Sequence, residues 1–178
     1  MRAHGSGNAG LTNFHRTFGG KLTAVVLGLD VAKMVAAVFF GALVAARLAT
    51  PGAGWSILAK YWAGLWCLLG HMFPCTFGFK GGKGILSGVT LLFCIDWRMG
   101  AIALGLFLIV VCLTRYISVG SIVGTASIVV TTPMFVGRNW VVNALAILLA
   151  ALVIFMHRSN IKRLLEGTEN KFSLHRKK

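Results

Sequence analysis

Three polar segments of the sequence carry residue types that bind phosphate groups. The first is residues 4–16, HGSGNAGLTNFHR, where glycines, hydroxyls, amides and an arginine occur together. Glycine lets backbone N–H groups approach a ligand closely, and hydroxyls and an arginine fork add donors for an anion. A flexible amino-terminal tail has a similar composition, and the residues alone leave that alternative open. The candidates for an anion-binding loop are Ser6, Gly7, Asn8, Gly10, Thr12, Asn13 and Arg16.

The second segment is the glycine-rich and basic stretch at residues 76–84. We expect Gly81, Gly82, Lys83 and Gly84 to form a second loop of backbone donors with a point charge, again suited to phosphate. The segment is not a nucleotide-binding Walker A loop. That motif has glycine where this chain has Phe77 and serine or threonine where it has Gly84, so ATP hydrolysis is not expected. A basic loop facing anionic lipid headgroups is the alternative.

The third segment is residues 157–169, HRSNIKRLLEGTE, which follows the last apolar stretch. If the helix continues here, His157 and Asn160 share one face at a spacing of three residues. Ser118 and Ser121 lie where two other apolar stretches meet and could add donors at the same membrane face, although serines there are often only helix caps. A basic helix lying on a membrane surface would look much the same as this segment.

The elements between these segments are apolar. The chain has 178 residues, of which 57% are hydrophobic and 12% are charged. The apolar positions run all the way round the expected helices, which excludes a soluble helical protein with a polar face. The sequence therefore predicts an all-α integral membrane protein, a polytopic helix bundle whose third span is too short to cross the bilayer fully. The expected spans are 22–46, 57–75, 85–96, 99–115, 121–137 and 139–156.

The distribution of lysine and arginine predicts the orientation. With the C-terminal tail in the cytoplasm, most of the 18 basic residues fall on that side of the membrane. Only Arg47, Lys60, Arg98 and Arg138 fall on the other side. We therefore expect one membrane-embedded domain, 1–178, in a bacterial cytoplasmic (inner) membrane, with all three polar segments facing the cytoplasm. It comprises a cytoplasmic glycine-rich motif (1–21), a transmembrane bundle (22–156) with a cytoplasmic loop (76–84), and a cytoplasmic basic tail (157–178). A nucleic-acid partner is not expected, because the basic residues are spread over short loops and a tail.

Two charged residues lie inside the first long span. Asp30 and Lys33 are three residues apart on one helix, and a charge at mid-bilayer costs roughly 2.5–3.5 kcal/mol. They should therefore pair with each other and support the first polar segment rather than contact a substrate, and His71 is expected to play a similar supporting part. We find no cluster of carboxylates for a metal site, and expect neither a metal nor a cofactor.

The segments GSGNAGLTNFHR, GHMFPCTFGFKGGKG and HRSNIKRLLEGTE, in this order, resemble the signature segments of the bacterial acyl-phosphate:glycerol-3-phosphate acyltransferases, the PlsY family. The resemblance implies a seven-helix membrane enzyme that moves a fatty acyl group from acyl-phosphate to the 1-hydroxyl of sn-glycerol 3-phosphate. The products would be lysophosphatidic acid and phosphate, in the first step of phospholipid synthesis. A soluble enzyme that makes acyl-phosphate is an implied partner, and membrane lipids surround the chain. The family's first helix is not found before the first segment, which leaves six spans.

The resemblance also implies roles for the site residues. Arg16 and Lys83 would neutralise the charge of the departing phosphate, while His157, Asn160 and a serine would orient glycerol 3-phosphate. Either His157 or the substrate's own phosphate could accept the hydroxyl proton, and we slightly favour the phosphate.

The rival functions are a transporter for phosphorylated solutes and a non-catalytic lipid-binding scaffold.

Overall fold

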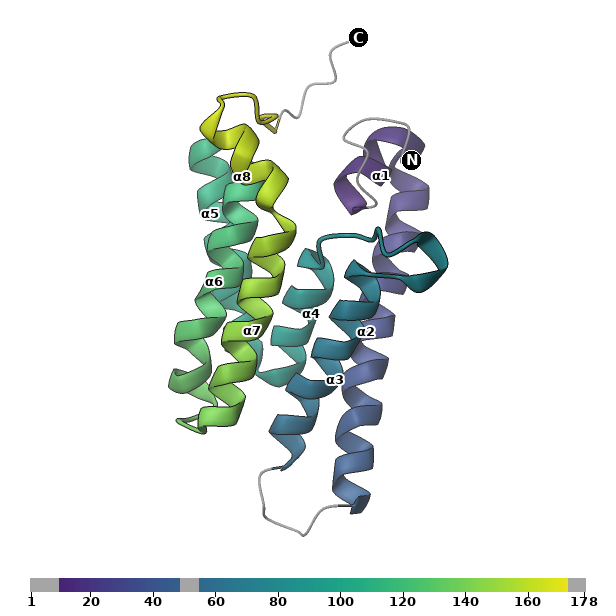
Figure 1. The fold of residues 1–178 in the computed structure, drawn as a ribbon, viewed down its shortest axis with the longest axis vertical. Helices are drawn as coiled ribbons and strands as arrows, with labels where there is room; N and C mark the ends of the chain where they lie inside the picture. Colours follow the sequence, from purple (N-terminus) through teal and green to yellow (C-terminus); the bar gives the residue numbers. More distant parts are fainter. Residues whose placement is uncertain (1–9, 49–54, 173–178) are drawn as a thin grey trace. The chain divides into compact units, whose positions relative to one another are not determined.

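The computed structural model describes residues 10–48 and 55–172, and the regular secondary structure in these ranges is helical (Figure 1). Ser6, Gly7 and Asn8 lie outside the described residues. The elements are α1 (Leu11–Phe18), α2 (Gly20–Leu48), α3 (Trp55–Met72), the short 3₁₀ turn η1 (Cys75–Phe77), α4 (Ile85–Ile95), α5 (Trp97–Thr114), α6 (Ile117–Phe135), α7 (Trp140–Met156) and α8 (Arg158–Leu165).

Each of the expected spans is a helix, with ends shifted by a few residues, so the all-helical fold class is confirmed. In the described residues, α2, α5 and α6 are each long and apolar enough to cross a membrane. The helices α7 and α8 together form a further candidate span that is bent by 56°. The helix α4 has 11 residues and is only about 16 Å long, which agrees with the expectation of a short third span.

The chain divides into two compact units, Met1–Ile95 and Asp96–Lys178. In the first unit, α2, α3 and α4 pack on one another through small residues. A Cβ added at Gly41 would lie 2.6 Å from the Ala63 Cβ, so α2 and α3 approach closely there. A Cβ at Gly64 would lie 2.5 Å from the side chain of Leu91, so α4 packs directly on the backbone of α3. Small residues of this kind are typical of helix interfaces in membranes.

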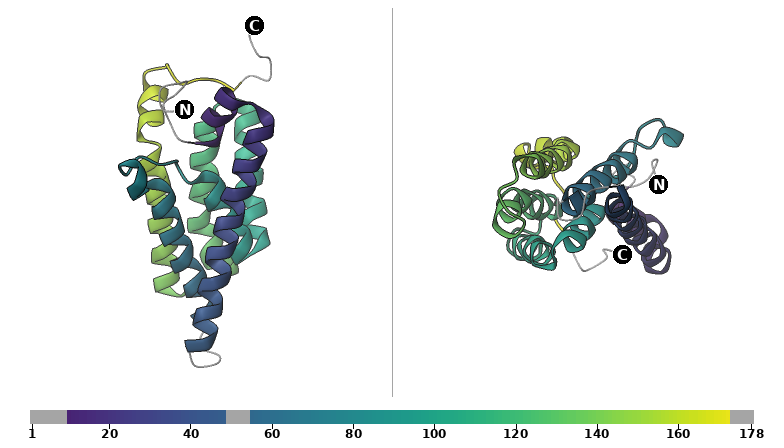
Figure 2. Two further views of the ribbon diagram at one scale, coloured as in Figure 1. Left: turned by 90° about the vertical axis from the view of Figure 1, so that its right-hand side faces the viewer. Right: turned by 90° about the horizontal axis from the view of Figure 1, so that it is seen from below.

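The second unit is built on the pair α5 and α6. Gly120 and Gly124, spaced four residues apart on α6, face the backbone of α5. A Cβ at Gly120 would lie 2.8 Å from the Phe107 carbonyl oxygen, and one at Gly124 would lie 2.7 Å from that of Ala103. The helix α7 also packs on α6 (Figure 2). This small-residue spacing brings α6 close enough to α5 to fix the position of its first turn.

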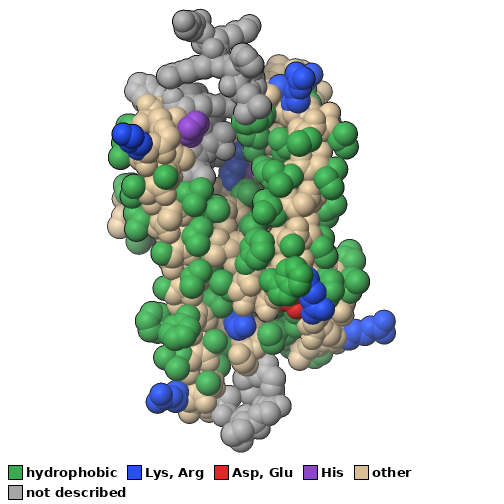
Figure 3. Space-filling model, turned by 180° about the vertical axis from the view of Figure 1, so that it is seen from behind, with side chains coloured by type: hydrophobic (Ala, Val, Ile, Leu, Met, Phe, Trp, Pro, Cys, Tyr) green, Lys and Arg blue, Asp and Glu red, His purple; other side chains and the backbone are tan. Residues whose placement is uncertain are grey.

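Large hydrophobic side chains are exposed along the helices. Phe39 and Phe40 on α2 are 62% and 61% exposed, and Leu113 on α5 is 80% exposed. Figure 3 shows hydrophobic side chains along most of the helical surface in that view, with most lysines and arginines nearer the helix ends. Lipid tails would cover this surface in a membrane, and the cost of leaving it in water is thereby avoided.

Each unit carries its polar segments at one end. In the first unit, α1, the beginning of α2, the end of α3 and the loop before α4 lie together (Figure 1). In the second unit, the end of α5, the beginning of α6, the end of α7 and α8 lie together. The predicted site residues are therefore concentrated at the helix ends within each unit.

Candidate functional site

The first polar segment ends in a helix. The expectation of a loop through Thr12 and Asn13 is wrong at these residues, because α1 begins at Leu11 directly after Gly10, whose backbone is extended. The rings of Phe14 and Phe18, on one face of the helix, are tilted by 40° with centroids 4.7 Å apart, and Asn13 is 2% exposed. The segment is thus a short helix that lies against α2 rather than an open loop.

The glycine-rich loop folds back onto the end of α3. The Gly81 N–H donates to the Met72 carbonyl (3.0 Å), and the Gly82 N–H donates to the His71 carbonyl (3.2 Å). The last carbonyls of a helix have no partner within it, and here the loop supplies the donors. Two of the loop's backbone N–H groups are thus bonded within the protein, so an anion bound at this loop would need other donors.

The loop returns to α4 through Gly84, which has a φ of 77°. A Cβ at Gly84 would lie 2.6 Å from Leu68 Cδ2 and 2.7 Å from Met72 Cε. Glycine is required here both for its left-handed backbone and for the space that Leu68 and Met72 occupy. Lys83, immediately before it, is half-buried.

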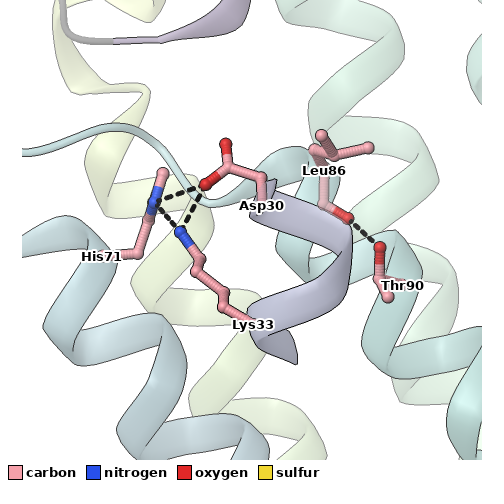
Figure 4. A network of polar contacts seen from close by, with 5 residues as sticks. All are labelled: Asp30, Lys33, His71, Leu86 and Thr90. Carbon is pink, nitrogen blue, oxygen red and sulfur yellow. Dashed lines mark hydrogen bonds and ion pairs between the residues drawn. The ribbon is translucent and has the colours of Figure 1, made fainter. Parts of the chain in front are cut away.

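Asp30, Lys33 and His71 form a polar cluster next to this loop (Figure 4). Lys33 Nζ lies 2.5 Å from Asp30 Oδ1 and 2.7 Å from His71 Nδ1. His71 Nδ1 also lies 3.7 Å from Asp30 Oδ1. The pairing of Asp30 with Lys33 is as expected, and the third partner is a residue at the end of α3, where the glycine-rich loop is attached.

In the second unit, the helix bends at His157, which ends α7 and precedes α8. Its side chain is 2% exposed, and its Nδ1 lies 2.8 Å from the Val153 carbonyl oxygen. A carbonyl oxygen only accepts, so Nδ1 carries the proton, and in the neutral ring Nε2 is the acceptor atom. One turn later, Asn160 is buried at 6% exposure, and its backbone N–H donates to the His157 carbonyl (2.8 Å).

Glu169 binds both the amide and a cation of α8. Asn160 Nδ2 donates to Glu169 Oε1 (2.6 Å), and Arg163 Nε donates to Glu169 Oε2 (2.7 Å). The Glu169 side chain is 7% exposed. Because the amide NH₂ of Asn160 is held by the carboxylate, the position of the amide oxygen is fixed as well.

Ser118 and Ser121 begin α6 beside this network and are 4% and 3% exposed. Ser118 Oγ makes no hydrogen bond of ordinary geometry among the described residues, yet it lies close enough to Glu169 to affect its carboxylate. The segment after Glu169 returns to the turn between α5 and α6, where the Phe172 N–H donates to the Arg115 carbonyl (2.6 Å). The first turn of α6 is therefore tied to the same network as α8.

Burial of the Glu169 carboxyl acts to raise its pKa, but the hydrogen bonds from Asn160 and Arg163 and the nearby Ser118 hydroxyl more than offset this, and the pKa lies below its usual range. The carboxylate is therefore charged at neutral pH, and in this state it forms an ion pair with Arg163.

The structure thus groups the predicted residues into two sets, one in each unit. Gly81, Gly82, Lys83 and Gly84 lie with the Asp30 cluster, while His157, Asn160, Ser118 and Ser121 lie with Glu169. The side chains of Thr12 and Arg16 lie outside what the structure describes. Sequence reasoning did not select Glu169 and Arg163. The scarcity of acidic residues, four in the whole chain, was a signal that could have identified Glu169 as a partner for these cations.

We predict that Glu169→Gln destabilises the protein by about 1–3 kcal/mol, because it removes a charged acceptor from Arg163 while leaving that cation in place. Thermal unfolding in detergent at neutral pH measures the change. Glu166→Gln is the matched control, since Glu166 is 51% exposed and lies 3.8 Å from Lys162 Nζ. An exposed pair of this kind contributes roughly 0.5 kcal/mol or less.

The same pair of variants tests the pH dependence. The pKa of Glu169 is lower in the folded protein than in the unfolded chain, so its stabilising effect is complete above the ordinary glutamate value of about 4.3 and is lost as the pH falls toward the folded-state pKa. The stability difference between the native chain and Glu169→Gln should therefore shrink below that pH. A difference that stayed constant down to acid pH would contradict the assigned role of the carboxylate.

Comparisons of this chain with known proteins all point to one family. Residues 1–167 match the family model described as "Glycerol-3-phosphate acyltransferase". The glycerol-3-phosphate acyltransferase of Thermoanaerobacter sp. (strain X514) is 39% identical over 171 residues, which covers 96% of this chain and 81% of that protein. The enzymes of the same name from Clostridioides difficile (strain 630) and Brucella canis are 39% and 38% identical.

Solved structures agree with the sequence relatives. A crystal structure of PlsY (YgiH), an integral membrane glycerol 3-phosphate acyltransferase, in its glycerol 3-phosphate form has a TM-score of 0.80 and 35% identity, and the match covers 97% of this chain and 82% of that one. The lysophosphatidic acid form of the same protein has a TM-score of 0.77 and 34% identity. The match of the family model, the relatives and the fold together show that this chain belongs to the glycerol-3-phosphate acyltransferase (PlsY) family and is a membrane-embedded acyltransferase.

Proposed function

We propose that the chain transfers a fatty acyl group from acyl-phosphate to the 1-hydroxyl of sn-glycerol 3-phosphate, which gives lysophosphatidic acid and inorganic phosphate. The observation that carries the proposal is the likeness to a PlsY structure in its glycerol 3-phosphate form over 97% of this chain. The lysophosphatidic acid form of that protein supports the same product. A soluble enzyme that makes acyl-phosphate would supply the donor, and phospholipid synthesis would consume the product.

The proposed reaction needs no covalent acyl-enzyme. The 1-hydroxyl oxygen attacks the acyl carbonyl carbon, the bond from that carbon to the phosphate oxygen breaks, and phosphate leaves. The enzyme has to position the two substrates and stabilise the charge that grows on the leaving phosphate. We assign that charge stabilisation to Lys83 and Arg16, with the first polar segment and the glycine-rich loop holding the phosphate groups.

We propose that His157 and Asn160 orient the glycerol moiety of the acceptor. With Nδ1 of His157 donating to Val153, its Nε2 is an acceptor to which a substrate hydroxyl can donate. The Asn160 amide, fixed by Glu169, offers its oxygen in the same way. The hydroxyl proton then passes to a phosphate oxygen of the substrates, with Ser118 or Ser121 supplying a further donor to the phosphate.

Activity in lipid bilayers tests the reaction and its donor. Purified protein should release phosphate from palmitoyl-phosphate only when glycerol 3-phosphate is present, with an equal amount of lysophosphatidic acid formed. Palmitoyl-CoA, offered at the same concentration, should give no product. Product from the CoA ester would contradict the proposed donor, and flux of glycerol 3-phosphate without turnover would indicate a transporter instead.

His157→Ala separates the two possible proton acceptors. If the substrate phosphate accepts the proton, the variant loses only one hydrogen bond to the substrate. The KM for glycerol 3-phosphate should then rise by about tenfold or more, and the shape of the pH–rate profile should stay unchanged. Steady-state kinetics across a range of pH gives both quantities. Disappearance of the acidic limb of the profile in the variant would assign the base to His157 and overturn the proposal.

We also propose that the polar ends of both units lie on the cytoplasmic side of the inner membrane, since most basic residues belong to the segments at these ends. Cys75, which is exposed beside the glycine-rich loop, is a natural probe for the first unit. In proteins with one cysteine each, Cys75 and Glu166→Cys should react with an impermeant maleimide only from the cytoplasmic side. Arg138→Cys, in the turn before α7, should react only from the other side. Labelling of Cys75 and residue 166 from opposite sides would contradict the proposed topology.

A further inference from the structure

Two phenyl rings are exposed in the turn that joins the end of α3 to the glycine-rich loop. Phe77 ends η1 and is 61% exposed, and Phe79 is 64% exposed. Lys80 follows them and is exposed as well. We call residues 75–80 the aromatic tip. Exposed apolar side chains that occur together mark a contact surface, and the cation beside them favours an anionic partner.

Backbone hydrogen bonds fold the aromatic tip into a defined turn. The N–H groups of Phe77 and Phe79 both donate to the Pro74 carbonyl oxygen, at 3.1 and 3.0 Å. Directly after the tip, the Gly81 N–H donates to the Met72 carbonyl oxygen at the end of α3 (3.0 Å). The two rings are therefore presented by a hydrogen-bonded turn that is attached to a helix at both of its ends.

The backbone of the aromatic tip takes a conformation that phenylalanine rarely adopts. Gly78 has a φ of 61° and a ψ of 38°, and Phe79 has a φ of 57°, so two successive residues lie in the left-handed region. Glycine enters this region easily, whereas a bulky side chain is strained there. Because most of Phe79 is exposed, contacts within the described chain offset little of that strain. A contact of the ring with a partner outside the chain would offset more of it.

The aromatic tip projects sideways from the helices of the first unit. In Figure 1 it extends past α2 at the level where α3 ends and α4 begins, and the end-on view in Figure 2 shows the same projection beyond these helices. The helix α4 begins with apolar residues, so this level lies near the boundary between the hydrocarbon and the headgroups of a membrane. The exposed surface of α3, with Trp62 and Trp66, leads up to the same level. A segment that extends sideways at this depth meets lipid and not bulk water.

We propose that the aromatic tip anchors the glycine-rich loop to the surface of the bilayer. The rings of Phe77 and Phe79 insert among the acyl chains just below the headgroups, and the Lys80 ammonium lies next to the phosphates of anionic phospholipids. Since Gly81 and Gly82 follow the tip directly, the anchor gives the loop a second fixed point besides its hydrogen bonds to α3. The inference concerns lipid contact and does not depend on the proposed reaction.

Fluorine nuclear magnetic resonance of the full chain tests the insertion of the rings. The protein is made with 4-fluorophenylalanine in nanodiscs of phosphatidylcholine and phosphatidylglycerol, and the signals of the two rings are identified by their loss in Phe77→Leu and Phe79→Leu. A phospholipid with a spin label near the headgroup end of its acyl chain should broaden both signals. It should also broaden that of the control Phe40, which is 61% exposed on α2.

Two results of this measurement would overturn the proposal. If a water-soluble gadolinium chelate broadens the signals of Phe77 and Phe79 and the labelled lipid does not, the aromatic tip faces water and is open to a soluble partner. If neither reagent broadens them while the labelled lipid broadens the signal of Phe40, protein covers the two rings.

Hydrogen exchange in nanodiscs tests whether the rings hold the loop. The double variant Phe77→Ser, Phe79→Ser should exchange the amides of residues 75–84 about tenfold faster or more, because the lost burial of two phenyl rings no longer opposes local opening. Thr76→Ala is the matched control, since it changes an exposed residue of the aromatic tip and keeps both rings. Equal exchange in the double variant and the control would overturn the anchoring role.

The part of Lys80 is tested by the composition of the lipid. Nanodiscs of phosphatidylcholine alone should speed exchange in the native chain relative to nanodiscs that contain phosphatidylglycerol, because the anionic partner of the ammonium is removed. The effect should be smaller in Lys80→Gln. An equal effect of lipid composition on the native chain and on Lys80→Gln would overturn the role of Lys80.

Discussion

A charged group inside an apolar helix has to be compensated by other protein groups, because hydrocarbon offers it no hydrogen bonds. In this chain the ammonium of Lys33 is compensated by Asp30 on the same helix and by His71 on the next one. That requirement ties α2 to the end of α3, where the glycine-rich loop is attached through the carbonyls of His71 and Met72. The position of the loop thus depends on the neutralisation of one partly exposed cation within an apolar helix.

The second unit meets the same constraint with Glu169. A basic helix that leaves the membrane carries several cations and few acids, and Glu169 compensates Arg163 while it also holds the Asn160 amide. The return of the chain to the Arg115 carbonyl fixes the beginning of α6 beside this network. In the second unit the carboxylate that compensates Arg163 also orients the Asn160 amide, so neutralisation of charge and preorganisation of this network have the same physical origin.

This arrangement suits the transfer of an acyl group from an activated donor. In the proposed reaction, acyl-phosphate carries a good leaving group, so the protein would have to hold two anionic substrates without their charges repelling them from the site. Cations and fixed donors at the helix ends would do this where the membrane meets water. In the proposed reaction, the exposed hydrophobic helices would leave the fatty chain in contact with lipid tails, so that the protein would not need a large acyl pocket.

The sequence alone determined the helical membrane fold. Long apolar stretches without a polar face would expose apolar surface to water, and in lipid a helix satisfies all of their backbone hydrogen bonds within the stretch. It also identified the three polar segments, because in each of them glycine, hydroxyl and basic residues occur close together without an apolar stretch between them. Only the tertiary structure decided that Thr12 and Asn13 lie on a helix, that the Gly81 and Gly82 N–H groups are used within the protein, and that Glu169 belongs with Asn160. These facts depend on contacts between residues distant along the chain or on which side of a group faces its neighbour. Spacing in a sequence carries the period of a helix but not the direction in which a donor points.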